Sequence, residues 1–414
     1  MTIANTGATG NTDSTDRAER AEQLRNDLAD YIKGWGTFRT PRVEAAFRAV
    51  PRHLFLPDVP LEVAYGRKPV VTRRAADGTS VSSASSPKLV ATMLEQLAVQ
   101  PGQRVLEIGA ATGINAALLA ELVGPTGTVV TIELDDDLAA SATESLEAAG
   151  YPHVEVICGD GALGHPDHAP YDRIIVTAEA WDIAPAWWDQ LTVGGRIVVP
   201  LRLHGSGLTR AIAFDLHQPD RMVSTSAVVC GFVPMRGTTE HAEHHVRLTD
   251  DVVLKVDADD LPDHAALAQA LTHPGQEHWT GIQVRHDEPA EHLDLWLLTT
   301  TASRFGRLSA GSQARTSGLA DPAPRWGGAA LYDAGAIAYL ATRDINDETL
   351  ELGVIVHGPD NTKLAAHATD LLTRWDSARP SQPTITANRA NSTPRPNTAA
   401  AHIIRPHTAI TVTW

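Results

Sequence analysis

The feature that most constrains the fold is an alternation of short β-branched runs with Ala- and Leu-rich stretches between Val81 and Met235. In chain order the apolar runs read VLEI, TVVTIE, VEVIC, RIIVT and GGRIVVPL, and three segments of helical composition separate them. Strands that alternate with helices in this way form parallel sheets with crossover helices. We therefore predict an α/β fold with an open, mostly parallel sheet and helices on both faces.

The sequence on either side of this alternation predicts two further parts. Residues 1–16 are polar and lack apolar spacing, so we expect a disordered tail. Residues 17–247 form the predicted α/β domain, which begins with two helices, the second capped by Thr40 with Pro41 at its first position. Residues 248–414 break the rhythm and predict a smaller α+β domain, for which peptide recognition is one candidate role and whose role the sequence does not decide.

Within this C-terminal domain the pattern is mixed. HWTGIQV, LDLWLLTTTA, ELGVIVHG and HTAITVTW are expected to be strands, and TKLAAHATDLLTRW is expected to be a helix. Residues 376–400 are rich in Pro, Ser, Thr and Asn, which predicts a long, partly disordered loop.

Composition excludes several classes of partner. Lys and Arg total 34 against 50 Asp and Glu, and the net charge of −16 argues against an extended nucleic-acid surface or an anionic-membrane surface. The N-terminus has no apolar signal region, and no apolar run reaches the ~18 residues that cross a bilayer. We expect a cytoplasmic protein without nucleic-acid or membrane partners, in which Cys158 and Cys230 are buried, reduced thiols. The sequence does not predict the oligomeric state.

The strongest local signal is the segment Val105–Gly113, in which an apolar strand runs into a turn of small residues and then a helix. Small residues let a ligand approach the backbone, and the helix N-terminus offers unpaired amides. The next strand ends in Glu133, where a carboxylate can accept both ribose hydroxyls of an adenosine. The third strand ends at Asp160, where a carboxylate can accept from an adenine amino group. Three strand ends are thus expected to meet at one crevice.

The turn differs from a dinucleotide fingerprint, because its spacing is Glu-x-Gly-x-Ala-x-Gly and no basic cluster accompanies it. This spacing resembles that of class I methyltransferases, which implies S-adenosyl-L-methionine as the cofactor. Ala111 stands in place of the middle glycine and narrows the space for the methionine part. The alternative is a purely structural turn. The predicted cofactor-binding residues are Ser83, Glu107, Gly109, Ala111, Thr112, Gly113, Asn115, Glu133, Leu134, Gly159, Asp160, Gly161 and Thr177.

A longer string of segments between Thr37 and Pro200 resembles the protein-L-isoaspartate O-methyltransferase family. These segments are RVEAAFRAVPRHLFLP, AYGRKPV, SSASSPKLVATMLEQL, VLEIGAATGINAALLAELVG, VEVICGDGALGHP, APYDRIIVTA and QLTVGGRIVVPL. The resemblance aligns Ser83, Ser85 and Pro87 with the family's Thr-x-Ser-x-Pro segment and implies that Ser85 is the active-site hydroxyl. The predicted substrate contacts are Tyr65, Ser86, Pro200 and Arg236.

Local physics agrees with this placement, because Ser86 can cap a helix that begins at Pro87, and a carboxylate near Ser85 would meet a favourable helix dipole. The alternative is that these serines only cap the helix. An aspartyl carboxylate has a reference pKa of ~3.9 and is already a nucleophile, so no obligatory general base and no metal are predicted. The cluster of His241, His244 and His245 is interpreted as solvated surface.

The segment CGFVPMRG, Cys230–Gly237, and the added C-terminal domain resemble the family variant associated with ribosomally made, modified peptides, especially lanthipeptides. That resemblance implies methylation of an Asp side chain in a precursor peptide, followed by an aspartimide that either persists or hydrolyses to isoaspartate. Within the segment, Arg236 could bind a carboxylate, although a final strand and turn would also explain the pattern. Two other functions stay open: repair of isoaspartyl or D-aspartyl residues in damaged proteins, and a catalytically degenerate peptide-binding scaffold.

Overall fold

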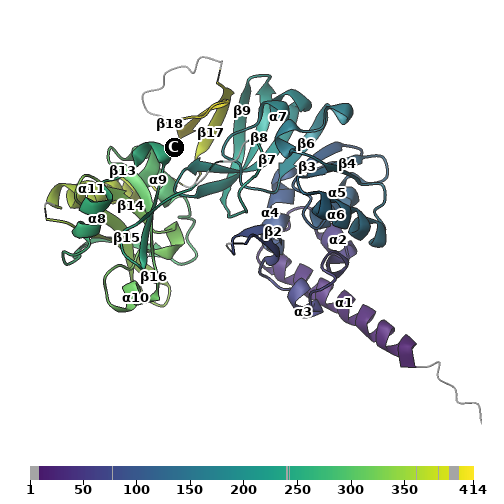
Figure 1. Ribbon diagram of the computed structural model, residues 1–414, viewed down its shortest axis with the longest axis horizontal. Coiled ribbons are helices and arrows are strands. Elements are labelled where there is room, and N and C mark those ends of the chain that lie inside the picture. Colours follow the sequence, from purple (N-terminus) through teal and green to yellow (C-terminus); the bar gives the residue numbers. More distant parts are fainter. Residues whose placement is uncertain are drawn as a thin grey trace, which may run out of the picture. The chain divides into compact units, whose positions relative to one another are not determined.

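The computed structural model describes residues 9–76, 78–238, 241, 243–359, 361–380, 382–390 and 401–414, with side chains from Thr15 onward (Figure 1). These residues form two compact units. The first unit is Met1–Pro200, Ala211–Ser226 and Cys230–Glu240, and the second is Leu201–Arg210, Ala227–Val229 and His241–Trp414. The division falls near the predicted boundary after residue 247, but the second unit also takes in short parts of the preceding strands.

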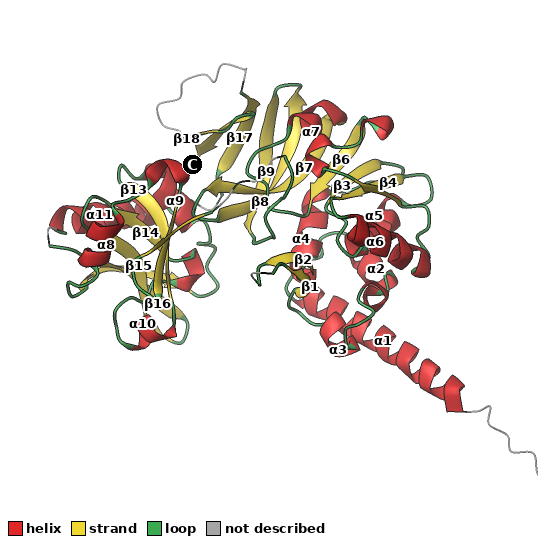
Figure 2. Ribbon diagram, viewed as in Figure 1, coloured by secondary structure: helices red, strands yellow, loops and turns green. Residues whose placement is uncertain are grey.

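The first unit is built on a largely parallel sheet. Its strands are β3 (Arg104–Ile108), β4 (Thr128–Glu133), β5 (Glu155–Cys158), β6 (Tyr171–Val176), β7 (Leu191–His204), β8 (Leu208–Gln218) and β9 (Arg221–Val229). Their order is β5-β4-β3-β6-β7-β8-β9. The pairs β3–β4, β3–β6, β4–β5 and β6–β7 are parallel. The predicted α/β fold class is confirmed, and all five predicted strands are present (Figure 2).

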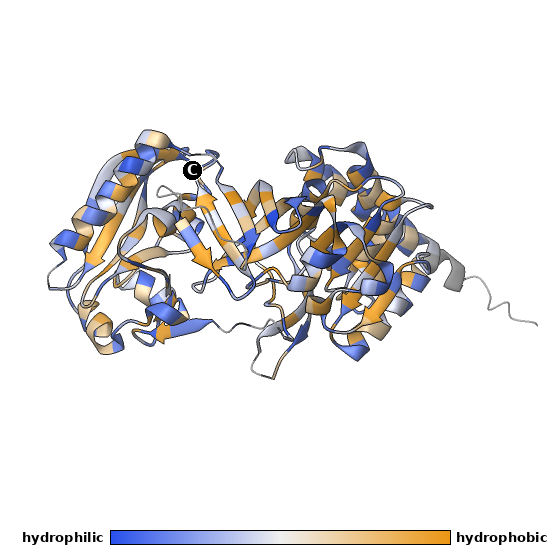
Figure 3. Ribbon diagram, turned by 90° about the horizontal axis from the view of Figure 1, so that it is seen from above, coloured by the Kyte–Doolittle hydropathy of each residue, from blue (hydrophilic) through white to orange (hydrophobic). Residues whose placement is uncertain are grey.

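Helices connect and cover these strands. They are α4 (Pro87–Leu97), α5 (Ile114–Val123), α6 (Asp136–Ala148) and α7 (Pro185–Gln190), with short 3₁₀ turns η2 (Gly161–Leu163) and η3 (Pro166–His168). Helix α5 packs on β3 and β4, and it is apolar on nearly every side because its residues are buried in the core. Figure 3 shows apolar colouring along the strands and mixed colouring along the helices, as expected for a sheet buried beneath amphipathic helices.

The N-terminal region contributes one long helix and several short elements. They are α1 (Thr9–Gly34), α2 (Pro41–Ala49), η1 (Arg52–Phe55), α3 (Leu61–Ala64), β1 (Val70–Arg74) and β2 (Ser80–Ala84). The expectation of a disordered tail over 1–16 is wrong for residues 9–16, which begin α1. Once a helix is nucleated, each added residue costs little, so polar residues extend it. Residues 1–8 lie outside the described part of the chain.

The second unit is mainly antiparallel. Its seven-stranded sheet has the order β10-β11-β13-β14-β15-β16-β12. These strands are β10 (His244–Arg247), β11 (Val252–Val256), β12 (Gln276–Arg285), β13 (Arg304–Ala310), β14 (Ala329–Tyr332), β15 (Ile337–Asn346) and β16 (Thr349–His357). Separately, β17 (Thr384–Arg389) and β18 (Ala401–Ile404) pair antiparallel with β19 (Thr408–Thr413). The other elements are η4 (Ala258–Asp260), α8 (His264–Ala270), α9 (Leu293–Thr300), α10 (Ser312–Thr316), η5 (Pro324–Trp326) and α11 (Thr362–Ala378).

Two predictions for this unit are wrong. LDLWLLTTTA forms helix α9 rather than a strand, because a short apolar run has no periodicity that separates a buried helix from a buried strand. The segment 376–400, expected to be a loop, contains the last residues of α11 and strand β17. Residues 391–400 lie outside the described part, so the expected disorder there is not addressed.

A buried ion pair organises the second unit near its first residues. The Arg210 guanidinium is fully buried and donates to Asp294 Oδ1 and, at 3.0 Å, to His292 Nδ1. Arg307 lies 3.4 Å from the other oxygen of the same carboxylate. Because a buried charge is costly without its partner, these residues must fold together.

Cysteine burial differs from the prediction at both positions, because Cys158 is exposed and Cys230 is half-buried. Both cysteines are free thiols, but Cys158 is exposed at the end of β5, where its Sγ lies 2.7 Å from Asp136 Oδ1. Strand β5 is an edge strand of the first unit's sheet order, so its last side chain is not covered. Among the described helices, none is both long enough and apolar enough to cross a bilayer.

The start of helix α2 depends on a carboxylate from another helix. Thr40 occupies the N-cap position but makes no side-chain cap. Instead Glu95 Oε1 accepts from the backbone amides of Arg39 (2.9 Å) and Thr40 (3.0 Å).

We predict that Glu95→Ala lowers the free energy of unfolding by about 1–3 kcal/mol, because these amides lose their acceptor. Urea unfolding followed by circular dichroism measures this. Glu144→Ala, on the exposed face of α6, is the control, and equal losses would contradict the assignment.

Candidate active site

A deep pocket opens where the parallel strands of the first unit end. It encloses about 1050 Å³ of empty space, including its mouth. Its walls come from the carboxyl ends of β3, β4 and β6, from β2 and α4, and from a segment that follows β9. The lining residues are Arg52, Val81–Ser85, Val90, Met93, Glu107–Thr112, Ile114, Asn115, Ile132–Leu134, Leu138, Gly161, Ile175, Thr177, Ala178 and Phe232–Arg236. Parallel α/β sheets bind ligands at this edge.

The floor of the pocket carries a buried carboxylate. Glu107 is completely buried on β3, where Asn115 Nδ2 donates to one oxygen (2.8 Å) and Thr131 Oγ1 donates to the other (2.7 Å). Burial raises the pKa of Glu107 to about 7, an effect that these two hydrogen bonds oppose and the charge of Glu133 adds to. Glu107 therefore changes its protonation state near neutral pH.

The glycine turn brings backbone close to the pocket. Gly109 has φ +101°, and a Cβ there would lie 2.6 Å from Thr177 Oγ1, which itself donates to the carbonyls of Ile108 and Gly109. Gly113, at φ +86°, is the N-cap of α5. Ala111 has φ +48°, a left-handed conformation that costs about 1–2 kcal/mol for a residue with a Cβ. The backbone of Ala111 therefore has the left-handed conformation that glycine adopts without strain.

Glu133 closes this turn against the end of β4. Its Oε2 accepts from the Ala111 amide at 2.8 Å, and its Oε1 accepts from the Leu134 amide at 2.9 Å. Oε1 also accepts from the Asp135 amide at 3.4 Å, so Oε2, with one donor, is the oxygen that keeps capacity for a ligand donor such as a ribose hydroxyl.

Ser85 lies in the opposite wall, immediately before α4. The buried Arg52 guanidinium donates to the Ser85 carbonyl (3.2 Å) and to the Ala64 carbonyl (2.8 Å), and burial lowers its pKa to about 10. Arg52 thus fixes the backbone of Ser85 and lines the pocket itself. Ser86 occupies the N-cap position of α4, but the expected side-chain cap is absent, because its hydroxyl donates to the Arg67 carbonyl instead (3.2 Å).

The segment Cys230–Gly237 forms a wall of the pocket and is neither a strand nor a simple turn. Backbone hydrogen bonds of 2.8 Å join Glu179 to Val233 and to Met235, which holds the segment along the end of β6. Its far end is fixed by Asp160, whose Oδ2 accepts from the amide and hydroxyl of Thr238 at 2.9 Å each. Although burial acts to raise the pKa of Asp160, these hydrogen bonds lower it.

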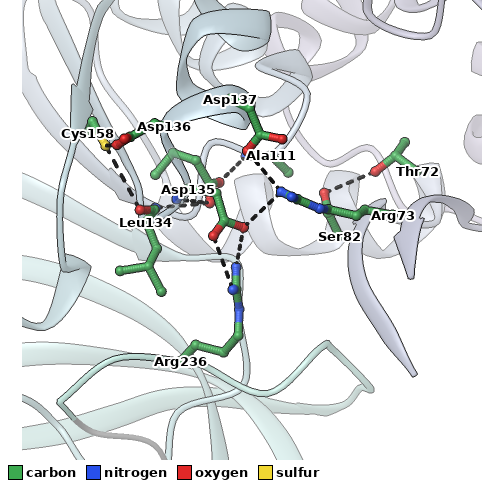
Figure 4. A network of polar contacts seen from close by, with 11 residues as sticks. Thr72, Arg73, Ser82, Ala111, Leu134, Asp135, Asp136, Asp137, Cys158 and Arg236 are labelled. Atoms are coloured by element: carbon green, nitrogen blue, oxygen red, sulfur yellow. Dashed lines mark hydrogen bonds and ion pairs between the residues drawn. The ribbon is translucent and has the colours of Figure 1, made fainter. Parts of the chain in front are cut away.

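A charged network borders the same pocket (Figure 4). Both terminal nitrogens of Arg236 donate to Asp135, at 2.6 and 3.2 Å, and Arg73 from β1 donates to Asp135 (3.3 Å) and to Asp137 (2.9 Å). The hydrogen bond from Arg236 is the main reason why the pKa of Asp135 is lowered. Two guanidiniums therefore share one carboxylate beside the pocket.

The structure brings most of the predicted site residues together, although it contains no ligand that tests their roles. The predicted residues in the lining are Ser83, Ser85, Glu107, Gly109, Ala111, Thr112, Asn115, Glu133, Leu134, Gly161, Thr177 and Arg236. Those outside the lining are Gly113, Gly159, Asp160, Tyr65, Ser86 and Pro200. Among the last group, the Tyr65 hydroxyl lies 2.8 Å from His53 Nδ1, and the Pro200 carbonyl accepts from the Ala180 amide.

Sequence reasoning did not single out Arg52 or the apolar lining residues Met93 and Ile132 as site residues. Arg52 belongs to the RHLFLP string that carries the family resemblance, which was the available signal. Its role depends on contacts with residues far along the chain, and such contacts leave no local pattern.

Comparison with known proteins decides the family. A family model described as protein-L-isoaspartate(D-aspartate) O-methyltransferase matches residues 22–240, more than half of the chain. The chain belongs to this family. Like its members, it is an S-adenosylmethionine-dependent protein carboxyl O-methyltransferase.

Individual relatives agree with this assignment. The protein-L-isoaspartate O-methyltransferase of Hyperthermus butylicus is 37% identical over 236 residues, which cover 55% of this methyltransferase and 94% of the relative. That of Methanopyrus kandleri is 42% identical over 178 residues, 43% of this chain and 76% of the relative. A solved protein-L-isoaspartate O-methyltransferase superposes with a TM-score of 0.50 at 22% identity, covering 87% of this chain and 96% of that one, which shows the shared fold.

The pocket of the methyltransferase fits its cofactor. The carboxylates of Glu107 and Glu133, which can accept hydrogen bonds, lie at the ends of adjacent strands. Gly109 packs so closely on Thr177 that this position of the lining has no room for a side chain. The remaining walls are largely apolar, as they are in most small-molecule sites. Glu107, Glu133 and the turn between them are the residues that would hold S-adenosylmethionine.

The buried carboxylate gives the enzyme a testable pH dependence. Folding raises the pKa of Glu107 from 4.5 to about 7, so between these two pH values the Glu107 carboxyl holds a proton in the folded protein that it has lost in the unfolded chain. The contribution of Glu107 to stability is therefore greatest below pH 4.5 and is lost as the pH rises from there to about 7. We predict that Glu107→Gln is more stable than the wild type at pH 8, by at most roughly 3 kcal/mol, and that the difference shrinks toward pH 5.

Urea unfolding at pH 5, 6, 7 and 8 measures this difference, with Glu144→Gln on the exposed face of α6 as the control. A difference between Glu107→Gln and wild type that does not change with pH would show that Glu107 has no raised pKa.

Proposed function

We propose that this methyltransferase esterifies the side-chain carboxylate of an Asp in a ribosomally made, modified precursor peptide, with lanthipeptides as the first class to test. The observation that carries the proposal is the position of Cys230–Gly237, the segment that resembles the peptide-modifying variant of the family. Five of its residues, Phe232–Arg236, line the pocket. A segment in that position can select the acceptor.

The reaction asks the protein for alignment rather than for proton transfer. Bound S-adenosylmethionine supplies a methyl group activated by its sulfonium. An oxygen of the ionised Asp carboxylate bonds to the methyl carbon while the carbon–sulfur bond breaks, and sulfur keeps the electron pair, which gives a methyl ester and S-adenosylhomocysteine. Ser85, two residues before α4 begins at Pro87, is proposed to donate a hydrogen bond to the acceptor, whose negative charge the helix dipole favours.

Two guanidiniums support an anionic acceptor. Arg52 lies in the wall beside Ser85 and adds a buried positive charge. Arg236 also lines the pocket, but Asp135 holds it in a bidentate pair, so a substrate carboxylate would have to share this guanidinium with Asp135. Arg236 is proposed to orient the peptide, and Arg52 to position Ser85.

Repair of isoaspartyl or D-aspartyl residues is the second candidate. It is favoured by the names of the relatives and by the solved protein-L-isoaspartate O-methyltransferase, whose match covers 87% of this chain. A match of that length extends into the second unit, so an added C-terminal part does not by itself separate the two functions. The scaffold alternative has no observation in its favour, because the pocket keeps Glu107, Glu133 and Ser85.

Mass spectrometry distinguishes the two enzymatic functions. We predict that an Asp-containing precursor peptide with its macrocyclic rings gains one methyl group and then loses methanol as the aspartimide forms. Three peptides are incubated with enzyme and S-adenosylmethionine: the ring-containing peptide, its linear form, and the same sequence with isoaspartate. Turnover of the isoaspartyl peptide alone would establish repair and refute the biosynthetic proposal.

The role of Ser85 has a separate test. Ser85→Ala is expected to lower kcat by about 10- to 100-fold, because one hydrogen bond to a charged acceptor is lost. Calorimetric affinity for S-adenosylmethionine should stay nearly unchanged. The matched control is Ser86→Ala, since that hydroxyl donates to the Arg67 carbonyl and lies outside the pocket lining. If the affinity of Ser85→Ala for the cofactor fell as far as kcat, Ser85 would be a cofactor ligand instead.

A further inference from the structure

Three side chains with metal-binding atoms meet on the first unit away from the active-site pocket. Glu155 is the first residue of β5, His165 precedes η3, and His168 ends it. The ligand atoms of these residues all lie within 4.8 Å of one another. None of them lines the pocket. Among the residues that the structure describes, this is the group of histidines and carboxylates close enough to hold one metal ion.

The geometry of the two imidazoles suits a shared ligand. Their rings stack with centroids 5.3 Å apart and planes 24° apart, so they face the same region. His168 Nε2 lies 2.9 Å from Glu155 Oε2. In a tetrahedral zinc site with bonds of about 2.1 Å, neighbouring donor atoms lie roughly 3.4 Å apart. The observed separations, 2.9 Å for one pair and at most 4.8 Å for the others, bracket this value.

The loop that carries the histidines is held in place by its backbone. Gln190 Oε1 accepts from the His165 amide at 2.8 Å, and the Tyr171 hydroxyl donates to the His165 carbonyl at 2.7 Å. The Gln190 amide group also donates to the Leu163 carbonyl at 3.0 Å. A fixed loop loses little conformational entropy when a metal binds, which favours affinity.

The ligand atoms are accessible from solvent, and charges of both signs lie near them. Asp167 stands between the two histidines in the sequence, and Arg104 Nη1 donates to the His168 carbonyl at 3.5 Å. His168 and Glu155 are each between two fifths and half exposed, so an ion can enter and keep a water ligand.

We propose that Glu155, His165 and His168 form a binding site for a divalent transition metal, with zinc the best fit, that ties the loop after β5 to the start of that strand. Two imidazoles and one carboxylate form an established zinc ligand set, and a water completes the tetrahedron. The same loop contains Gly161, which lines the pocket. The proposed role is structural, and the proposal is independent of which peptide the enzyme methylates.

This proposal departs from the expectation that the chain binds no metal. That expectation considered only His241, His244 and His245, because they are adjacent in sequence. In the described structure His245 pairs with Glu243 at 2.7 Å, and Lys255 also contacts that carboxylate (3.0 Å), so a cation there would compete with an ammonium. The proposed site instead joins two histidines, three positions apart, to Glu155, which lies ten positions before the first of them.

Metal titration of the full chain tests the site. Chelator-treated enzyme is titrated with Zn²⁺ by calorimetry and with Co²⁺ by visible absorption, and bound metal is counted by elemental analysis. We expect one equivalent of tight binding, weakened at least about tenfold by His165→Ala and by His168→Ala. His245→Ala is the matched control, because it removes a histidine from another His–Glu pair and should leave the titration unchanged.

A second readout separates binding from damage to the fold. Zn²⁺ should raise the Tm of the wild type and of His245→Ala, but not of His168→Ala, because a ligand that binds only the folded state stabilises it. Circular dichroism confirms that each variant is folded. The proposal is overturned if the wild type binds no stoichiometric metal, if His165→Ala and His168→Ala bind as tightly as the wild type, or if His245→Ala abolishes binding.

Discussion

The parallel pairing of β3 with β4 and β6 is the constraint on which the site depends. Because the three strands run in the same direction in register, Glu107, Glu133 and Thr177 come to one edge of the sheet. Hydrogen bonds then fix each group where its strand ends, as when the Glu133 carboxylate accepts from the Ala111 amide. The cofactor side of the pocket is thus a consequence of strand direction. Most of its polar groups belong to residues at or next to the ends of these strands.

The other half of the site uses contacts that strand order does not determine. Arg52, from a short 3₁₀ turn, fixes Ser85, and Asp160 anchors Thr238 at the end of the segment that walls the pocket. The acceptor side is thus assembled from the N-terminal layer and from chain that follows β9. Relatives that share the sheet can differ here, so the acceptor is the part of the reaction that these segments can change.

The sequence predicts the cofactor side of the pocket better than the acceptor side. Strand periodicity and the small-residue turn have local signals, so the sheet and the residues of the cofactor pocket were predicted. The hydrogen bonds from Thr238 to Asp160 were not predicted, because they join residues 78 positions apart, and the contact of Asp160 with adenine stays a prediction. Helix α9 was taken for a strand because its run of Leu and Trp is short and shows no helical period. The exposure of Cys158 depends on β5 being at the edge of the sheet order, which residue type cannot show.

The ion pair between Arg210 and Asp294 shows where the C-terminal part cannot simply be cut away. Residues 201–210 belong to the second unit although they lie within the stretch that matches the family. A chain shortened after residue 240 would keep Arg210 and lose the carboxylate that pairs with it. The native packing of residues 201–210 therefore depends on sequence beyond the stretch that matches the family.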